Sequence, residues 1–83
     1  MNVNQLECAL QALGVPADAY SIGRERDESY CLVRDDENWS VFFSERGKRS
    51  SEQTFASEEE ACRELMNRLM HDHVVQRYLH DRQ

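Results

Sequence analysis

The spacing of hydrophobic residues changes along this chain, and the changes divide it into a helical beginning, a strand-rich middle and a helical end. Near the N-terminus, apolar residues recur every three or four positions, as on one face of a helix, at Val3, Leu6, Leu10 and Leu13. The Asn4 carboxamide is suited to cap the free amides of the first turn. Gly14 and Pro16 favour termination. The pattern predicts a first helix over residues 4–13.

Between residues 20 and 55, hydrophobic and polar positions alternate, which is typical of strands with one buried face. We predict four strands, over residues 20–22, 29–34, 38–44 and 52–55. Alternation divides the second strand into two faces, Tyr30 and Leu32 against Cys31 and Val33, and the third likewise, Trp39, Val41 and Phe43 against Phe42. The connections are a charged turn over residues 23–28, an acidic turn over residues 35–38 and a loop from Glu45 to Ser51.

A C-terminal helix is predicted from residue 57 onward. Ser57 and Glu60 have the spacing of a capping box, in which the hydroxyl and the carboxylate each satisfy a free amide. A broad apolar stripe follows, formed by Ala61, Cys62, Leu65, Met66, Leu69 and Met70. The polar segment from His71 to His73 interrupts it, and the helix either breaks there or continues. The expected fold is α+β: an N-terminal helix, a four-stranded antiparallel meander and a C-terminal helix, packed on one sheet face.

The length of 83 residues fits one small domain, residues 1–83, with a thin core. The formal net charge of −6 disfavours nucleic acid as a partner and favours a basic protein. Cys8, Cys31 and Cys62 are interpreted as buried thiols in a reducing cytoplasm, because an odd number argues against a disulfide framework. No signal peptide or membrane-spanning stretch is visible, which also favours the cytoplasm.

Residue types that carry catalysis are present, but their surroundings favour structural roles. All three histidines lie between residues 71 and 80, with a cation among them at Arg77. The glutamates at residues 58–60 suit the start of a helix, and their charge raises the pKa expected for the Cys62 thiol. The sequence therefore predicts no enzyme activity, no metal site and no cofactor.

Surface residues around the third strand are the remaining candidates for function. The loop after this strand carries charges of both signs at a turn, and the turn before it is acidic. Tryptophan and arginine contribute many of the contacts that dominate protein–protein binding. The predicted partner-binding residues are Asp35, Asp36, Glu37, Trp39, Ser44, Glu45, Arg46, Lys48 and Arg49. A homodimer through an exposed sheet face is left open.

The run from Ala17 to Leu69 resembles a group of small bacterial immunity proteins that are encoded beside toxins. The shared pattern consists of Ala19-Tyr20-Ser21-Ile22, Tyr30-Cys31-Leu32, Trp39 to Gly47, Phe55, and Ser57 to Cys62. Its most specific parts are the segment W-S-V-F-F-S-E-R-G, which begins at Trp39, and the segment E-A-C, which ends at Cys62. Lys48 and Arg49 make the following loop longer and more basic than in that pattern.

The resemblance implies an immunity protein that binds a toxin of the tuberculosis necrotizing toxin type, an NAD glycohydrolase, and blocks its active site. The positions that match the motif, and that we place at the contact by hypothesis, are Trp39, Ser44, Glu45, Arg46 and Gly47. The acidic turns would imitate the phosphates of the dinucleotide. Two other functions stay open: a stand-alone interaction or regulatory domain, and a metal- or ligand-binding module using the tail histidines.

Overall fold

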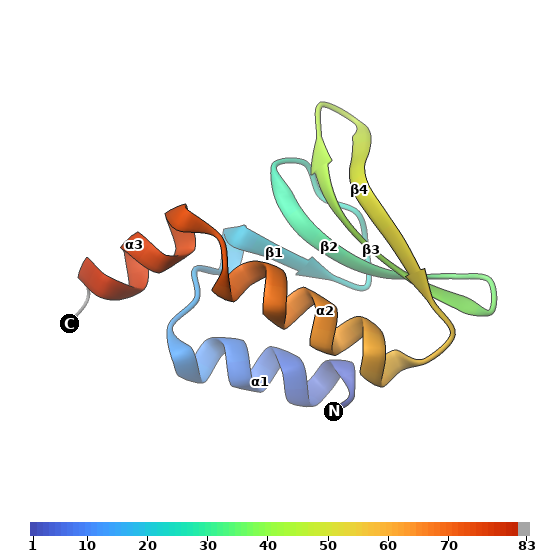
Figure 1. The fold of residues 1–83 in the computed structure, drawn as a ribbon, viewed down its shortest axis with the longest axis horizontal. Coiled ribbons are helices and arrows are strands. Elements are labelled where there is room, and N and C mark those ends of the chain that lie inside the picture. Colours follow the sequence, from blue (N-terminus) through green and yellow to red (C-terminus); the bar gives the residue numbers. More distant parts are fainter. Residues whose placement is uncertain (82–83) are drawn as a thin grey trace.

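The computed structural model describes residues 1–81, which form three α-helices, a short 3-10 turn and one four-stranded sheet (Figure 1). In chain order the elements are α1 (Val3–Leu13), η1 (Ala17–Ala19), β1 (Tyr20–Ile22), β2 (Ser29–Asp35), β3 (Asn38–Glu45), β4 (Lys48–Phe55), α2 (Glu58–Met70) and α3 (His73–Asp81). The α+β class is confirmed. Of the two alternatives for the C-terminal helix, the break is the one observed, between Met70 and His73.

The first helix begins one position earlier than predicted, and its cap is Asn2 rather than Asn4. The Asn2 side chain accepts a hydrogen bond from the Gln5 amide at 2.8 Å, and the Gln5 side chain accepts one from the Asn2 amide at 2.9 Å. This reciprocal pair is a capping box. The Val3 amide also donates to Glu58 at 2.8 Å, a tertiary contact that favours the earlier start and that local sequence does not reveal.

Strand β1 is parallel to β2, so the prediction of a purely antiparallel meander is wrong. The strand order is β1-β2-β3-β4, and the other two pairs are antiparallel. Neighbouring strands become parallel when their connection returns the chain to the starting end of the first strand. Residues 23–28 do so: the Gly23 amide donates to Leu32, and the Glu28 amide donates to Ser44. A polar composition predicts a connection here but does not distinguish a crossover from a hairpin.

The connection after β3 is a two-residue hairpin turn, shorter than predicted. Arg46 and Gly47 have φ values of 52° and 76°, the positive values of a type I′ turn, and Glu45 is opposite Lys48. Such a turn reverses the chain at once. Strand β4 therefore begins at Lys48 instead of Glu52.

A β-bulge decides which way the side chains of β4 point. The register between β3 and β4 shifts between Val41 and Phe43, and Ser51 in the shifted stretch has a φ of 54°. An extra residue reverses the alternation of faces beyond the bulge. Arg49 and Glu52 consequently share one face, where they form an ion pair of 2.6 Å.

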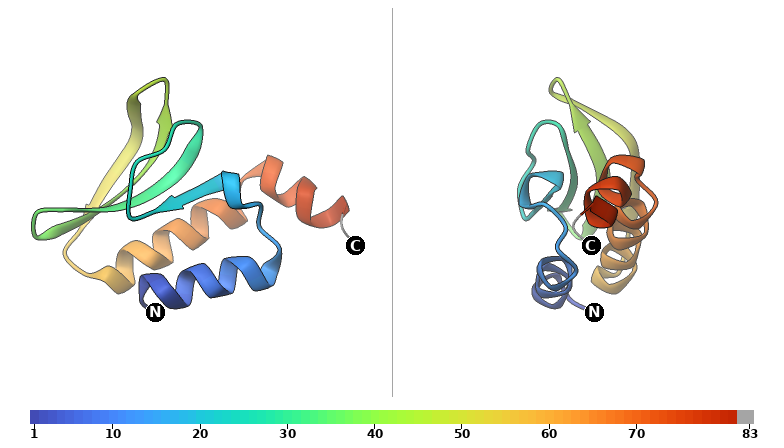
Figure 2. Two further views of the ribbon diagram at one scale, coloured as in Figure 1. Left: turned by 180° about the vertical axis from the view of Figure 1, so that it is seen from behind. Right: turned by 90° about the vertical axis from the view of Figure 1, so that its left-hand side faces the viewer.

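Helices α1 and α2 cover one face of the sheet, side by side and with their N-termini together (Figures 1 and 2). The main core lies between these helices and the sheet. It contains Leu6, Leu10, Val15, Tyr20, Leu32, Val41, Ala61, Cys62, Leu65, Leu69 and Val75. The predicted division of β2 and β3 into two faces is confirmed, because Leu32 and Val41 join this core whereas Phe42 belongs to a separate cluster.

The helix-free face of the sheet is covered by the connection between β1 and β2. Cys31, Val33 and Phe42 form a second, smaller buried cluster on this face. The Arg26 amide lies 3.5 Å from the Cys31 sulfur, and the thiol donates to the Arg26 carbonyl at 3.4 Å. These contacts hold residues 23–28 against the sheet.

The three cysteines do not share one environment. Cys31 and Cys62 are buried, as predicted, but Cys8 is exposed, so that the prediction is wrong for Cys8. Helical geometry gives the reason: Leu6 and Leu10 point to the core from α1, and Cys8, two residues from each, lies on the other side of the helix.

Asp72 links the last helix to the sheet. Its Oδ1 accepts hydrogen bonds from the amides of Val74 and Val75 at 2.9 and 3.1 Å, and its Oδ2 accepts one from the Tyr30 hydroxyl at 2.6 Å. Val75 is buried in the core, whereas Val74 is 77% exposed. Figure 1 shows α3 extending from this attachment away from the rest of the fold.

Candidate functional site

The two turns that we expected to act together lie at opposite ends of β3 (Figure 1). Asp36 and Glu37 form the turn before this strand, and Arg46 and Gly47 form the turn after it. All eight residues of β3 separate them. The structure therefore does not join the two turn tips into one surface, although it does join residues that flank them.

Arg49 connects those flanking residues. Its Nε donates to Glu25 at 2.8 Å, and its Nη1 donates to Asp35 at 2.8 Å and to Glu52 at 2.6 Å. The guanidinium lies over the Phe42 ring, 4.2 Å from the ring centroid. We call Glu25, Asp35, Arg49 and Glu52 the Arg49 cluster. Arg49, predicted in a loop, thus lies on β4 and draws together the β1–β2 connection, the end of β2 and β4 itself.

The Arg49 cluster is acidic overall and partly exposed. Three carboxylates and one guanidinium give it a formal charge of −2, and their side chains are between 32% and 43% exposed. The hydrogen bond from Arg49 is the main cause that holds the pKa of Asp35 below its ordinary value. The same carboxylates raise the pKa of Arg49 further above neutrality. Asp35 and Arg49 are therefore ionised at neutral pH, in a patch on the helix-free face.

Among the other predicted contact residues, Ser44 is structural. It is only 1% exposed, and its hydroxyl donates to Asp27 at 3.4 Å. Asp27 also accepts a hydrogen bond from the Gly47 amide at 3.0 Å. Asp27 thereby fastens the β3–β4 hairpin to the β1–β2 connection.

The remaining predicted residues are one half-buried tryptophan on the helix-covered face and five exposed residues at the two turns. Trp39 is half-buried against the main core, with the Arg34 guanidinium 5.4 Å from its ring centroid. The exposed members lie at the two turns and are Asp36, Glu37, Glu45, Arg46 and Lys48. Among the nine residues predicted, one side-chain ion pair forms, between Asp35 and Arg49.

A second candidate surface lies between α2 and the sheet, and the sequence analysis did not find it. Glu60, Glu64 and Arg68 recur at four-residue spacing along α2, and Asp72 continues the series. We call this surface the α2 furrow; its helix wall is Glu60, Glu64, Arg68 and Asp72, and its sheet wall is Tyr30, Phe43, Gln53 and Phe55. The four-residue recurrence of charge was the available signal, but it is also typical of a solvated helix face.

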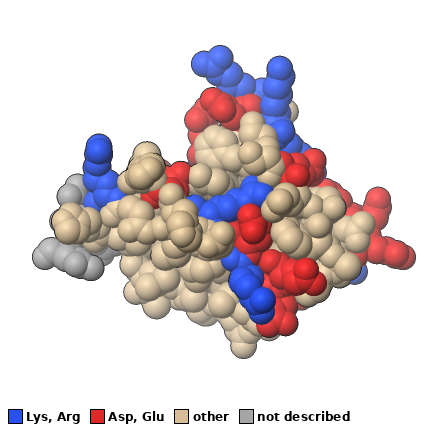
Figure 3. Space-filling view, in the orientation of Figure 1, with Lys and Arg blue, Asp and Glu red and all other residues tan. Residues whose placement is uncertain are grey.

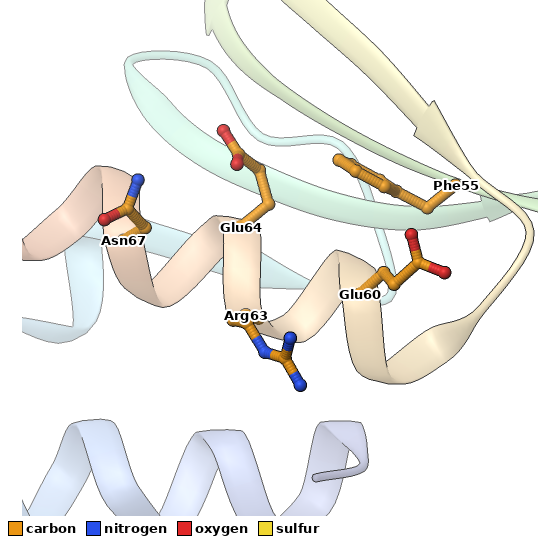
Figure 4. Close-up of a pocket in the computed structure, with 5 residues that line it drawn as sticks. All are labelled: Phe55, Glu60, Arg63, Glu64 and Asn67. Carbon is orange, nitrogen blue, oxygen red and sulfur yellow. The ribbon is translucent and has the colours of Figure 1, made fainter.

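Three adjoining depressions make up the α2 furrow. The first has a volume of about 350 Å³; Figure 4 shows Glu60, Glu64 and Asn67 on its helix side, Phe55 above them and Arg63 turned away toward α1. The second, of about 460 Å³, shares Glu64 with the first. The third, of about 310 Å³, shares Tyr30 and Phe43 with the second and ends at α3. In Figure 3 a band of red and blue side chains crosses this side of the molecule.

The charges of the α2 furrow are only partly paired. Arg68 donates from Nε to Glu64 at 2.7 Å and from Nη2 to Gln53 at 3.3 Å. Within the described residues, the carboxylates of Glu60 and of Glu28, at the other end of the furrow, have neither a hydrogen bond nor an ion pair with protein groups. The furrow therefore keeps negative charge that the fold does not neutralise.

The sheet wall of the α2 furrow is largely aromatic. The rings of Tyr30 and Phe43 meet edge to face, with centroids 5.0 Å apart. Burial, the hydrogen bond to Asp72 and the charge of Asp72 together raise the pKa of Tyr30 to about 12. Burial also acts to raise the pKa of Asp72, but hydrogen bonds from Tyr30 and from the amides of Val75 and Val74 outweigh it, and the pKa is lowered. Asp72 is thus a fixed negative charge at the end of the furrow that adjoins α3.

Groups suited to catalysis or metal binding are dispersed within residues 1–81. No three side chains of histidine, cysteine, aspartate and glutamate are placed there to hold a metal ion. His71 and His73 are exposed, and His71 Nδ1 lies 2.7 Å from the Asn67 carbonyl oxygen. Burial and the nearby Glu58 raise the pKa of the Cys62 thiol. No helix in this part of the chain has the length and apolar character needed to cross a bilayer.

Comparisons with protein-family models, with curated proteins and with solved structures found no significant match to this chain.

Proposed function

We propose that this chain is an immunity protein that binds a cognate secreted toxin, an NAD or NADP glycohydrolase, in the cytoplasm of the producing cell and occludes its active site. The resemblance of the segment from Trp39 to Gly47 to proteins of this kind suggests the partner. The structural observation that supports the proposal is the Arg49 cluster, an acidic patch on the helix-free face.

The Arg49 cluster has the properties of a phosphate mimic. A site that binds a dinucleotide presents positive potential to a pyrophosphate, and fixed carboxylates are attracted to the same potential. Arg49 holds three carboxylates from separate segments within 2.8 Å of its nitrogens. Because these groups are already ordered, association loses little side-chain entropy.

The dimensions of the protein agree with a role as an inhibitor. A stable protein–protein interface buries about 800 Å² on each partner, against a total accessible surface of 5573 Å² here. One face therefore suffices, and the exposed turn of Asp36 and Glu37 adjoins the Arg49 cluster at Asp35, at the end of the β2–β3 hairpin.

The function is tested by co-expressing this chain with the toxin domain encoded beside its gene and following cellular NAD. The expected result is that NAD stays near its level in toxin-free cells, whereas toxin alone depletes it. An unrelated protein of similar size and charge is the control for expression load. Equal depletion with and without this chain would refute the proposal.

The contact face is tested separately, by neutralising the turn of Asp36 and Glu37 with Asp36→Asn and Glu37→Gln. Two lost charge contacts correspond to about a tenfold weaker complex, with the melting temperature unchanged. The matched control is Glu7→Gln with Asp18→Asn, which removes the same charge from exposed sites on α1 and η1. Equal affinities for the two double variants would exclude this turn from the interface.

The second candidate function is a stand-alone interaction or regulatory domain without a toxin partner. The α2 furrow favours it, because an inhibitor that uses the helix-free face has no need of a second open surface. A toxin domain encoded beside the gene, together with NAD protection, decides for the immunity function. Their joint absence decides for the alternative.

A further inference from the structure

The helix wall of the α2 furrow presents carboxylates at a spacing that an extended peptide can match. Glu60 and Glu64 are one helical turn apart, which places their Cβ atoms about 5–6 Å from each other. In an extended chain, alternate residues point the same way and lie about 6.6 Å apart. Two basic side chains at alternate positions of a strand-like segment can therefore meet Glu60 and Glu64.

The charge balance of the furrow favours a cationic occupant. Four carboxylates, those of Glu28, Glu60, Glu64 and Asp72, face it or close its ends, against two guanidinium groups, Arg68 within it and Arg63 at the rim of the first depression, where it is turned toward α1 and paired with Glu59. Arg68 is already engaged by Glu64 and Gln53 and is 14% exposed. The unneutralised charge at Glu60 and Glu28 lies at the two ends, so a cation is attracted along the whole length.

The opposite wall suits the stems of long basic side chains. Tyr30, Phe43 and Phe55 are only partly buried, and Tyr30 and Phe55 pack against the main core. Lysine and arginine cover apolar surface with their methylene groups while their charged ends stay solvated, and aromatic faces attract their cationic heads. Aromatic rings facing a row of carboxylates bind both parts of such a side chain.

We infer that the α2 furrow is a docking site for an extended, basic segment of a partner protein, with lysine or arginine at alternate positions. A second copy of this chain does not fit, because two surfaces of a protein with net charge −6 repel each other. Nucleic acid is repelled for the same reason. The inference does not depend on a toxin partner, since the furrow and the Arg49 cluster are on opposite faces of the sheet.

The test is a titration of the ¹⁵N-labelled full chain with a blocked pentapeptide, Thr-Arg-Thr-Arg-Thr. Amide shifts are expected at residues 43, 53, 60, 64 and 68, with binding that weakens as sodium chloride increases. The same peptide with citrulline in place of arginine keeps the shape and loses the charge, and it is expected to bind at least fivefold more weakly. Equal binding of the two peptides, shifts confined to the helix-free face, or no shifts would overturn the inference.

A pair of variants gives the matched control. Glu60→Gln removes a carboxylate with no partner among the described residues, so the fold should be unaffected, and one lost ion pair should weaken peptide binding roughly two- to fivefold. Glu7→Gln removes the same charge from α1, outside the furrow, and should leave binding unchanged. Identical behaviour of the two variants would refute the site. NAD protection should be the same for Glu60→Gln and the unaltered chain, which separates this inference from the immunity proposal.

Discussion

The two faces of the sheet each place one arginine among carboxylates, but with different results. On the helix-free face, Arg49 satisfies three carboxylates and covers the ring of Phe42. On the helix-covered face, Arg68 forms an ion pair with one carboxylate, that of Glu64. The aromatic residues of the sheet wall beside it are only partly buried. Similar sets of charged and aromatic residues therefore form a closed, preformed patch on one face and an open groove on the other. The difference depends on how many partners each charged group has.

The largest predicted effect is a loss of stability on truncating one of two adjacent phenylalanines, Phe42 on the closed face or Phe43 on the open one. Phe42→Ala removes a ring that is 0% exposed and should lower the free energy of unfolding by about 3–5 kcal/mol. Phe43→Ala removes a half-buried ring from the sheet wall of the furrow and should cost roughly half as much, because less apolar area is lost. Urea denaturation measures both. Equal costs would show that the furrow is as closed as the other face.

The second prediction concerns the hydrogen bond that closes the end of the furrow. Tyr30→Phe removes a donor to the Asp72 carboxylate and should cost about 2 kcal/mol at neutral pH. Burial and Asp72 raise the pKa of Tyr30 from 10.0 to about 12, so this contribution is complete below pH 10 and is lost as pH rises through about 12.

Tyr20→Phe is the control for Tyr30→Phe, because Tyr20 belongs to the same core but its hydroxyl makes no hydrogen bond within the described residues. Little change at neutral pH is expected for this variant. Thermal denaturation between pH 7 and pH 11 measures the two variants, and a Tyr30→Phe variant as stable as Tyr20→Phe would contradict the role of Asp72 as an anchor.

The third prediction tests the Arg49 cluster. Arg49→Met keeps much of the side-chain volume over Phe42 but leaves three carboxylates without their cation, which should cost about 1–2 kcal/mol at low salt. The pKa of Asp35 is lowered in the folded protein, so the stabilisation is present above the ordinary pKa of 3.8 and is lost as pH falls below it.

The difference between Arg49→Met and the unaltered chain should therefore shrink below pH 4 and also at 1 M salt. Arg68→Met, in the furrow, is the comparison: it breaks one ion pair rather than three and should cost less. Chemical denaturation at several values of pH and salt concentration measures the free energy of unfolding of both variants and of the unaltered chain. A cost independent of both would mean that packing on Phe42, and not charge, accounts for the effect.

The smallest predicted effect is a gain in stability from a substitution at the β-bulge in β4. Ser51 has a φ of 54°, a conformation that costs an L-residue about 1–2 kcal/mol and glycine almost nothing. Allowing for the greater chain entropy of glycine, Ser51→Gly should stabilise the protein by about 0.5–1 kcal/mol. Ser50→Gly, at an extended neighbouring position, should destabilise it by a similar amount. Melting temperatures that fall in both variants would argue against the bulge.

Local sequence determined the order of the helices and strands and the two faces of the central strands. Alternation along β2 and β3 separated Leu32 and Val41 from Phe42, because side chains of a strand point alternately to its two sides. Gly14, with a φ of 83°, ended the first helix as its chemistry predicts. Ser57 likewise accepts a hydrogen bond from the Glu60 amide at the start of α2. The Glu60 carboxylate makes no hydrogen bond in return within the described residues, so only half of the predicted capping box forms.

Only the tertiary structure decided the direction of β1, the extent of β4 and the partners of the charged residues. Residues 23–28 lie across the sheet because Cys31, on β2, and Ser44, sixteen positions away on β3, bond to them, and no local pattern reports such contacts. The bulge at Ser51 places Arg49 and Glu52 on the same face, whereas a strand without a bulge would put two residues three positions apart on opposite faces.

The residue types at both candidate surfaces were visible in the sequence, but their grouping was not. Glu25, Asp35 and Glu52 are separated by at least ten positions, and they meet because Arg49 reaches all three in the folded chain. The α2 furrow combines a helix with strands that precede it in the sequence. The sequence determined which charges and rings each element carries, and the packing of α2 against the sheet decided which of them are paired and which stay open, because pairing depends on distance in space.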